Sequence, residues 1–305
     1  MKVSATYVSH PLNFIRPAGT SRGILRQKFC WYILLRTDSG AKGLGDVSFI
    51  PGLSVEDPGE IEIQIDHICK LINRGELDPA ADLPALPGLQ FALETALLDL
   101  KGGGKRILFP SSFTRGREGI ATNGLIWMGD LKSMKQQIRE KMQQGFKVLK
   151  LKVGALGADQ ELHLLRDIRG QYGPEELEIR LDANGAWSPA EALDKLKEFA
   201  SLGIHSLEQA IAPGQVEAMR DLCVDSPVPL ALDEELIGIE SRDQRAWLLQ
   251  NIRPAYIIIK PGLLGGFRIA REWISLAEEE HIGWWVTSAL ESAVGLNAIA
   301  QWTAS

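Results

Sequence analysis

Short apolar runs alternate with stretches of helical periodicity over the last two thirds of the chain. From about Gly119 this pattern predicts helices that separate seven strands, at 120–128, 147–153, 177–183, 204–208, 229–233, 256–260 and 283–288. One helix has a clear start signal, because Ser188 can cap it, Pro189 suits its first position and Glu191 completes a capping box. Alternating strands and helices favour parallel pairing through right-handed crossovers. We therefore expect a TIM-type (β/α) barrel over residues 116–305.

The first third of the chain has a different pattern. β-Branched and aromatic residues, interrupted by Pro and Gly, predict extended segments from Lys2 to about Asp46. Two helical patterns follow, at Ile61–Asn73 and Leu89–Leu100. Antiparallel strands followed by helices are typical of a small α+β domain. We expect such a domain over residues 1–115, so that the whole chain belongs to the α/β class.

Composition narrows the possible partners and location. The chain has 305 residues, 45% of them apolar and 24% charged, as is usual for a globular protein. The net charge of −6 argues against a nucleic-acid surface. Neither a signal peptide nor a membrane-spanning stretch is expected. The three cysteines lie far apart, which favours a reduced, cytoplasmic protein. We expect a monomer or homo-oligomer with a small-molecule carboxylate substrate and no membrane or nucleic-acid partner.

Six ionisable residues lie at the ends of five consecutive predicted strands. After an initial pair of lysines they recur at intervals of 25 to 30 residues, and they are Lys150, Lys152, Asp182, Glu208, Asp233 and Lys260. A parallel barrel gathers the ends of its strands around one mouth, where its catalytic groups converge. A single charged residue is usually a solvated surface group. Six in this arrangement favour a functional site, because buried unpaired charges cost several kcal/mol each.

The residue types predict the chemistry of this site. Asp182, Glu208 and Asp233 offer only oxygen ligands, which favours Mg²⁺, or Mn²⁺, over zinc. Such a cation can stabilise the charge that develops when a substrate carboxylate becomes an enediolate. A free lysine has a pKa of about 10.4, and neighbouring positive charge lowers it. Lys152 is the better candidate base, whereas Lys260 could be a second acid/base or a fixed cation.

Several segments resemble a known family. "LKLKVG", "RLDANGAWSP", "LALDEEL", "IIIKPGLLGG" and "TSALESAVGLNAIAQ" are similar to the enolase superfamily, muconate-lactonizing-enzyme subgroup. The resemblance covers nearly the whole chain. "NGLIWMG" and the last of these segments are most similar to the o-succinylbenzoate synthases of menaquinone biosynthesis.

The resemblance implies an N-terminal capping domain over a modified barrel, with Mg²⁺ on the three carboxylates. It implies that Lys152 removes the proton α to the substrate carboxylate and then helps the hydroxyl to leave. Lys260 would act as a cation, and Lys150 would tune Lys152. Family members carry an eighth strand, so we expect the last barrel strand to be missing from this chain. Residues expected to contact substrate, or to close over it, are Arg180, Asn184, Ser288, Gly265 and the loop Thr20–Arg22.

Three functions remain open. The first is a Mg²⁺-dependent dehydratase, a carbon–oxygen lyase. The second is a racemase or epimerase of N-acylamino acids or dipeptides, in which Lys152 and Lys260 exchange protons on opposite faces. The third is a non-catalytic metal-binding barrel, which the three clustered lysines argue against. The first two reactions both begin with removal of an α-proton, so the ionisable residues alone do not separate them.

Overall fold

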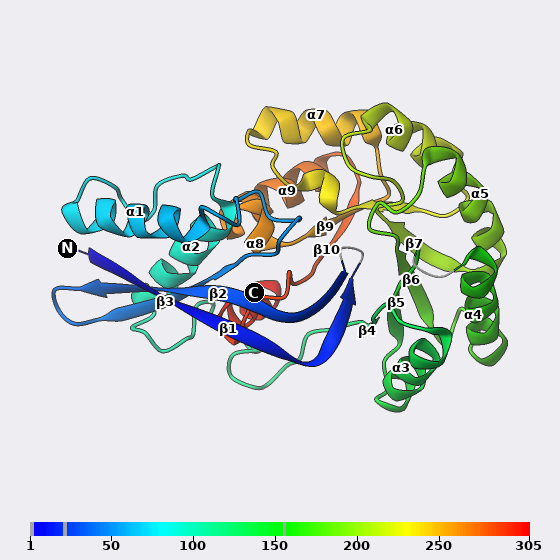
Figure 1. Cartoon of the computed structure of the whole chain (residues 1–305), viewed down its shortest axis with the longest axis horizontal. Coiled ribbons are helices and arrows are strands. Elements are labelled where there is room, and N and C mark those ends of the chain that lie inside the picture. Colours follow the sequence, from blue (N-terminus) through cyan, green and yellow to red (C-terminus); the bar gives the residue numbers. More distant parts are fainter. Residues whose placement is uncertain (1–2, 21–22, 155–156) are drawn as a thin grey trace.

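The N-terminal part of the chain forms an antiparallel sheet covered by two helices. The computed structural model describes residues 3–20, 23–154 and 157–305. The sheet has the order β1-β2-β3, and α1 and α2 pack on it around one apolar core (Figure 1). These elements are β1 (Val3–Thr20), β2 (Gly23–Thr37), β3 (Lys42–Ser48), α1 (Ile61–Arg74) and α2 (Pro87–Lys101).

A curved parallel sheet forms the rest of the fold. Its order is β10-β9-β8-β7-β6-β5-β4, so β4 and β10 are its two edges. All seven predicted strands are present in the described residues, and the α/β fold with a barrel-like parallel sheet is confirmed. The strands are β4 (Gly124–Ile126), β5 (Val148–Lys152), β6 (Glu178–Asp182), β7 (Ile204–Glu208), β8 (Leu230–Leu232), β9 (Tyr256–Ile259) and β10 (Gly283–Val286).

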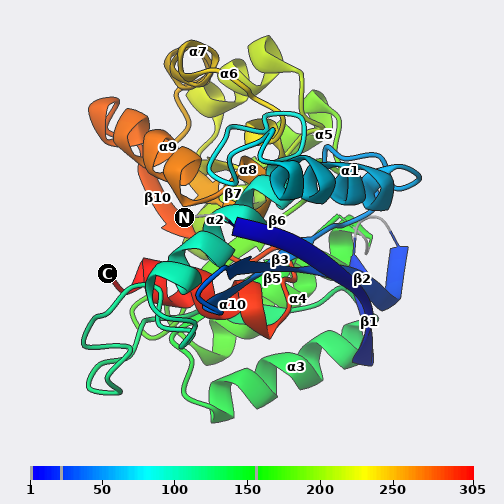
Figure 2. The same cartoon turned by 90° about the vertical axis from the view of Figure 1, so that its left-hand side faces the viewer.

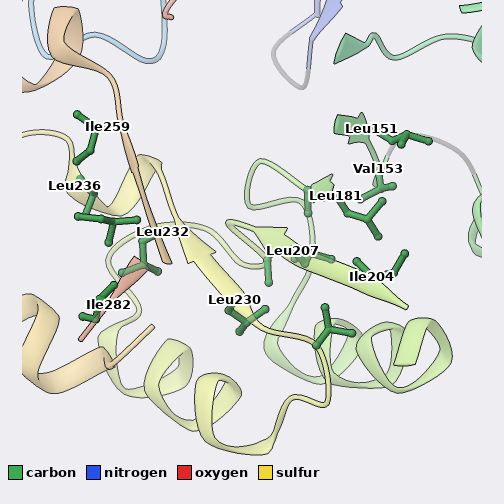
Figure 3. Close-up of a cluster of buried hydrophobic side chains, with 14 of the residues drawn as sticks. Leu151, Val153, Leu181, Ile204, Leu207, Leu230, Leu232, Leu236, Ile259 and Ile282 are labelled. Carbon is green, nitrogen blue, oxygen red and sulfur yellow. The ribbon is translucent and has the colours of Figure 1, made fainter. Parts of the chain in front are cut away.

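Helices cover the outer face of the parallel sheet. The strands direct alternate apolar residues towards these helices, which creates the main core shown in Figure 3. The predicted capping box of Ser188 and Glu191 begins α5. The helices are α3 (Leu131–Gln143), α4 (Ala158–Gln171), α5 (Pro189–Phe199), α6 (Val216–Asp225), α7 (Arg242–Ile252), α8 (Pro261–Leu264), α9 (Phe267–Glu279) and α10 (Ala293–Thr303).

Helices of the second part of the chain pack against the N-terminal part. α10 contacts β3 and α2 of the N-terminal part (Figure 2). The proposed domain boundary at residue 115 lies between α2 and β4, in a fully described segment without helix or strand, and it stays a prediction. Within the part of the chain that the structure describes, every helix is too short or too polar to span a bilayer.

Candidate active site

Three neighbouring strands bring ionisable residues into one row across the parallel sheet. Lys152 lies opposite Asp182 in the register of β5 and β6, and Asp182 lies opposite Glu208 in that of β6 and β7. Each of these residues is the last of its strand. Asp233 and Lys260 directly follow β8 and β9. The predicted residues therefore lie at the carboxyl ends of the strands, where barrel enzymes place their functional groups.

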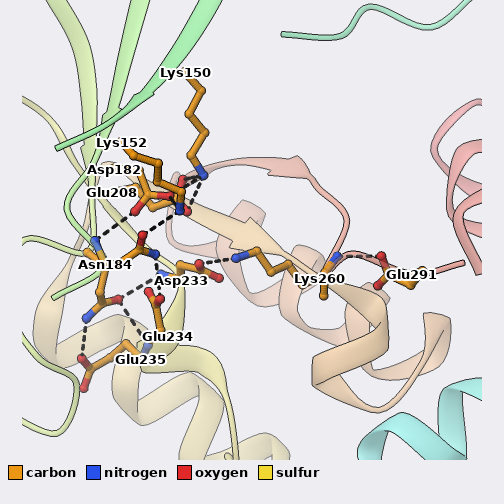
Figure 4. A network of polar contacts seen from close by, with 12 residues as sticks. Lys150, Lys152, Asp182, Asn184, Glu208, Asp233, Glu234, Glu235, Lys260 and Glu291 are labelled. Carbon is orange, nitrogen blue, oxygen red and sulfur yellow. Dashed lines mark hydrogen bonds and ion pairs between the residues drawn. The ribbon is translucent and has the colours of Figure 1, made fainter. Parts of the chain in front are cut away.

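The lysines form ion pairs with all three carboxylates (Figure 4). Lys150 Nζ lies 2.8 Å from Asp182 Oδ2 and 2.6 Å from Glu208 Oε2. Lys152 Nζ lies 2.6 Å from the same Asp182 oxygen. Lys260 pairs with Asp233. The structure thus brings together all six ionisable residues that the sequence singles out.

Burial makes these ion pairs energetically important. The exposed fractions of Asp182, Glu208 and Asp233 are 0%, 1% and 2%. A buried carboxylate loses its hydration, which costs several kcal/mol unless a partner of opposite charge compensates. Three lysines face three carboxylates here, and loss of Lys260 would leave the buried Asp233 without its ion-pair partner.

The ion pairs shift the pKa values of the lysines upward. Burial alone would lower the pKa of Lys150, but the carboxylates of Asp182 and Glu208 outweigh burial and raise it. Burial alone would also lower the pKa of Lys260, but the negative charge of Asp233 outweighs burial and raises it. At both lysines the neighbouring carboxylates therefore outweigh neighbouring positive charge.

The carboxyl groups are shifted in opposite directions. Burial raises the pKa of Glu208, and the negative charge of Asp182 raises it further. Burial alone would also raise the pKa of Asp182, but the positive charges of Lys150 and Lys152 outweigh burial and lower it. The lysines thus hold Asp182 ionised, while the positive charge available to Glu208 does not offset its burial.

The donor set fits a hard divalent cation. Among residues 3–20, 23–154 and 157–305, no three acidic, His or Cys side chains are grouped so as to hold a metal ion, because the carboxylates face lysine ammonium groups instead. The donors are nevertheless oxygen-only, buried and on adjacent strand ends, as Mg²⁺ prefers. A cation would compete with the lysines for these oxygens.

Sequence reasoning named Asn184 only as a substrate contact and missed Gln209, Glu234 and Glu235, whose polar groups lie next to the site. Asn184 Oδ1 accepts a hydrogen bond from Lys152 Nζ at 2.7 Å, and Asn184 Nδ2 donates to Glu234 Oε1 at 2.9 Å. The buried side chain of Gln209 accepts from the backbone N–H groups of Asp233 and Glu235. A signal for the missed residues was present in the sequence, since "LEQ" places Gln209 directly after Glu208 and "LDEEL" places Glu234 and Glu235 directly after Asp233.

Arg180, another predicted substrate residue, lies opposite Lys150 in the register of β5 and β6 but pairs with a different group. Arg180 Nε donates to Glu178 Oε1 at 2.6 Å, and its guanidinium lies 4.2 Å from the ring centroid of Trp285. Ser288 is exposed after β10, and the carbonyl of Gly265 accepts from Gln90 on α2. Their contact with substrate, like that of Asn184, stays a prediction. In the loop Thr20–Arg22, residues 21–22 lie outside the described residues.

Known proteins are similar to this chain in both sequence and fold. Residues 133–305 match the family described as enolase C-terminal domain-like. An o-succinylbenzoate synthase from Desulfotalea psychrophila is 46% identical, over 98% of this chain and 89% of that protein. The crystal structure of MenC from the same organism matches with a TM-score of 0.88 and 41% identity, over 100% of this chain and 91% of that one. An L-Ala-D/L-Glu epimerase from Bacillus subtilis is 27% identical, over 88% of this chain and 75% of that protein.

Proposed function

Because the chain belongs to the enolase superfamily, we propose that it is a Mg²⁺-dependent carbon–oxygen lyase that forms o-succinylbenzoate. The substrate would be 2-succinyl-6-hydroxy-2,4-cyclohexadiene-1-carboxylate, which loses water by syn-dehydration in menaquinone biosynthesis. The observation that carries this proposal is the 46% identity to an o-succinylbenzoate synthase over nearly the whole chain. The six ionisable residues at the strand ends are the groups that such a reaction needs.

The three carboxylates are the candidate metal ligands. Asp182, Glu208 and Asp233 would hold the cation at the carboxyl ends of β6, β7 and β8. When bound, Mg²⁺ would supply positive charge that stabilises the negative charge developing on the substrate carboxylate. Lys150 contacts both Asp182 and Glu208. It would therefore orient two of the ligands and remain charged, in keeping with its raised pKa.

Lys152 is the candidate acid and base. In its neutral form it would take the proton from the carbon α to the substrate carboxylate, which breaks the C–H bond. The electron pair left behind then forms the new C=C bond as the C–O bond to the hydroxyl breaks. Lys152 returns the proton to that oxygen, so water leaves from the face on which the proton was removed. Asn184 orients the Lys152 amine by a hydrogen bond of 2.7 Å.

Lys260 has the properties of a fixed cation. It follows β9, whereas Lys152 ends β5, so the two amines come from well-separated strands. Burial opposes the effect of Asp233 on Lys260, but its pKa is raised overall. A lysine with a raised pKa stays protonated at neutral pH and is a poor base. This supports a role in stabilising negative charge on the substrate.

Epimerisation is the second candidate function, and the similarity to an L-Ala-D/L-Glu epimerase favours it. In that reaction Lys152 and Lys260 would exchange protons on opposite faces of one carbon. Lys260→Ala separates the two mechanisms, since deuterium exchange on one enantiomer only would be lost in two-base chemistry. A dehydratase would instead lose overall turnover, by about 10²- to 10³-fold if Lys260 acts as an electrostatic stabiliser.

Turnover by the purified protein tests the proposal. The cyclohexadiene substrate is incubated with protein and Mg²⁺, with protein and EDTA, and with Mg²⁺ alone, and o-succinylbenzoate is quantified. N-Succinylamino acids and dipeptides are assayed for racemisation or epimerisation in parallel. We expect product only with protein and Mg²⁺. Absence of metal-dependent dehydration would refute the proposal, and metal-dependent epimerisation in its place would establish the second candidate.

A further inference from the structure

A buried lysine of the N-terminal sheet reaches a segment that follows the last barrel strand. Lys28 on β2 is only 5% exposed. Its Nζ donates to the carbonyl of Leu290 at 2.5 Å and to that of Ala289 at 3.4 Å, and it also contacts Ser48 Oγ. Burial of an ammonium group is unfavourable unless its hydrogen bonds are satisfied. The carbonyl oxygens of residues 289–290 are therefore fixed partners of this lysine.

A carboxylate of the same sheet anchors the next part of that segment. Asp46 Oδ2 on β3 accepts from the backbone N–H groups of Ser292 at 2.7 Å and Gly295 at 3.3 Å, at the start of α10. A Cβ atom on Gly295 would lie 2.9 Å from this oxygen, closer than real Cβ atoms approach. Glycine is thus required for the contact. Lys28 and Asp46 hold the chain on both sides of Glu291.

The segment held by Lys28 lies directly against the segment that carries Lys260. Glu291 Oε1 would lie 2.7 Å from a Cβ atom on Gly262, two residues after Lys260. Ile50 of the N-terminal part packs with Leu263 and Ala289 in one small apolar cluster. Close-packed interiors transmit displacements from one side chain to the next. A shift of residues 289–291 would therefore move the backbone next to Lys260.

We propose that Lys28 is a positioning residue for Lys260. By fixing the carbonyls of Ala289 and Leu290, it holds residues 287–292 against residues 260–263, and this sets the place of the Lys260 ammonium group in the site. Lys28 is buried between β2 and residues 289–290, and its ammonium group bonds to protein oxygens there. The kinetic consequence rests on the proposed dehydratase function, whereas the structural consequence rests only on the contacts described here.

The kinetic consequence is tested by measuring kcat and KM for a matched pair of variants. Lys28→Met keeps the length of the side chain and removes its hydrogen bonds, and Lys42→Met is the control, because Lys42 is an exposed lysine on β3. We expect Lys28→Met to lower kcat about tenfold or more, since small misplacements of catalytic groups have effects of this order. KM should stay within about twofold, because no substrate contact is lost. Lys28→Arg, which retains a cationic donor, should recover part of kcat, and Lys42→Met should behave as wild type.

The structural consequence is tested by hydrogen exchange, which needs no substrate. We expect the backbone amides of residues 289–295 to exchange faster in Lys28→Met than in wild type or Lys42→Met. If the wild type does not dehydrate the substrate, the proposed function fails, and the exchange result still decides whether Lys28 holds the segment. Unchanged exchange in Lys28→Met, or faster exchange with unchanged kcat in an active enzyme, overturns the positioning role. If Lys28→Met does not fold, Lys28→Gln, whose shorter side chain cannot reach both carbonyls, takes its place, with faster exchange expected and unchanged exchange contradicting the proposal.

Discussion

The two ends of the same parallel strands carry charge in very different ways. At the carboxyl ends, Asp182 and Glu208 are almost fully buried and pair with lysines. Nearer the amino ends, Arg180 is partly exposed, pairs with Glu178 and lies over an aromatic ring. His205 there stacks on Tyr256 with a centroid distance of 4.9 Å. Charges that remain partly hydrated lose little solvation, so they depend little on a partner of opposite charge.

This difference supports the proposal that the carboxyl ends of the strands form the functional end of the sheet. Buried ion pairs are often no more stable than apolar residues of the same volume. A cluster of six ionisable groups, four of them buried and two partly buried, is therefore poorly explained by stability alone. At the amino ends, aromatic packing and a partly exposed ion pair are sufficient to explain the charged groups there. Burial together with charge, and not charge alone, distinguishes the carboxyl ends from the amino ends.

The largest difference between the two ends should appear in activity. Lys147 and Lys152 lie at opposite ends of the β5 region, and Lys147 is exposed. We expect Lys152→Ala to lower kcat for dehydration by about 10²- to 10⁴-fold, because the proton-transfer group is lost. Lys147→Ala should leave kcat unchanged. Similar losses in both variants, or full activity in Lys152→Ala, would remove the functional distinction between the ends.

A substitution at the carboxyl ends of the strands should also destabilise the protein more than one nearer the amino ends. In metal-free protein, Asp182→Asn leaves Lys150 and Lys152 beside a neutral amide, and the loss of a buried partner costs about 3–5 kcal/mol. Arg180→Met removes a partly exposed ion pair, and its cost should not exceed about 1 kcal/mol. Urea unfolding followed by circular dichroism measures both values. Equal destabilisation by the two substitutions would contradict the account.

A smaller effect is expected in the pH dependence of stability. Burial and Asp182 raise the pKa of Glu208 above its ordinary 4.5, so the folded state binds this proton more tightly than the unfolded state. The resulting stabilisation is present below the unfolded pKa and is lost as the pH rises towards the folded pKa. Glu208→Gln removes this dependence. Between about pH 5 and 7, the unfolding free energy of metal-free wild type should fall more steeply than that of the variant.

Parallel unfolding curves for wild type and Glu208→Gln across this range would show that Glu208 is not the titrating group. Glu178→Gln is the control from the other end of the sheet, since Glu178 is partly exposed. Its pH profile should follow that of wild type.

Local sequence signals were sufficient to predict the strands and the principal charges. The alternation of residues places Lys150 and Lys152 on one face of β5, and the five strands β5 to β9 each end at or just before an ionisable residue. The capping box at Ser188 fixes where α5 begins. Such features depend on neighbours along the chain, which is why the sequence reveals them.

Contacts between distant segments were not predictable in this way. Lys28 in a long hairpin resembles any exposed strand lysine, and its carbonyl partners lie more than 260 residues later. The pairing of Lys150 with two carboxylates, and the link from Lys152 through Asn184 to Glu234, depend on how neighbouring strands are placed. No local pattern encodes that placement.

Calorimetric titration of metal-free protein with Mg²⁺ tests most directly whether the carboxyl-end cluster is a metal centre. Wild type and Glu208→Gln are compared with Glu178→Gln, which changes a carboxylate at the other end of the same sheet. We predict that wild type and Glu178→Gln bind Mg²⁺ with similar affinity, while Glu208→Gln binds at least about tenfold more weakly. Absence of binding to wild type, or equal affinity in all three proteins, would contradict this account.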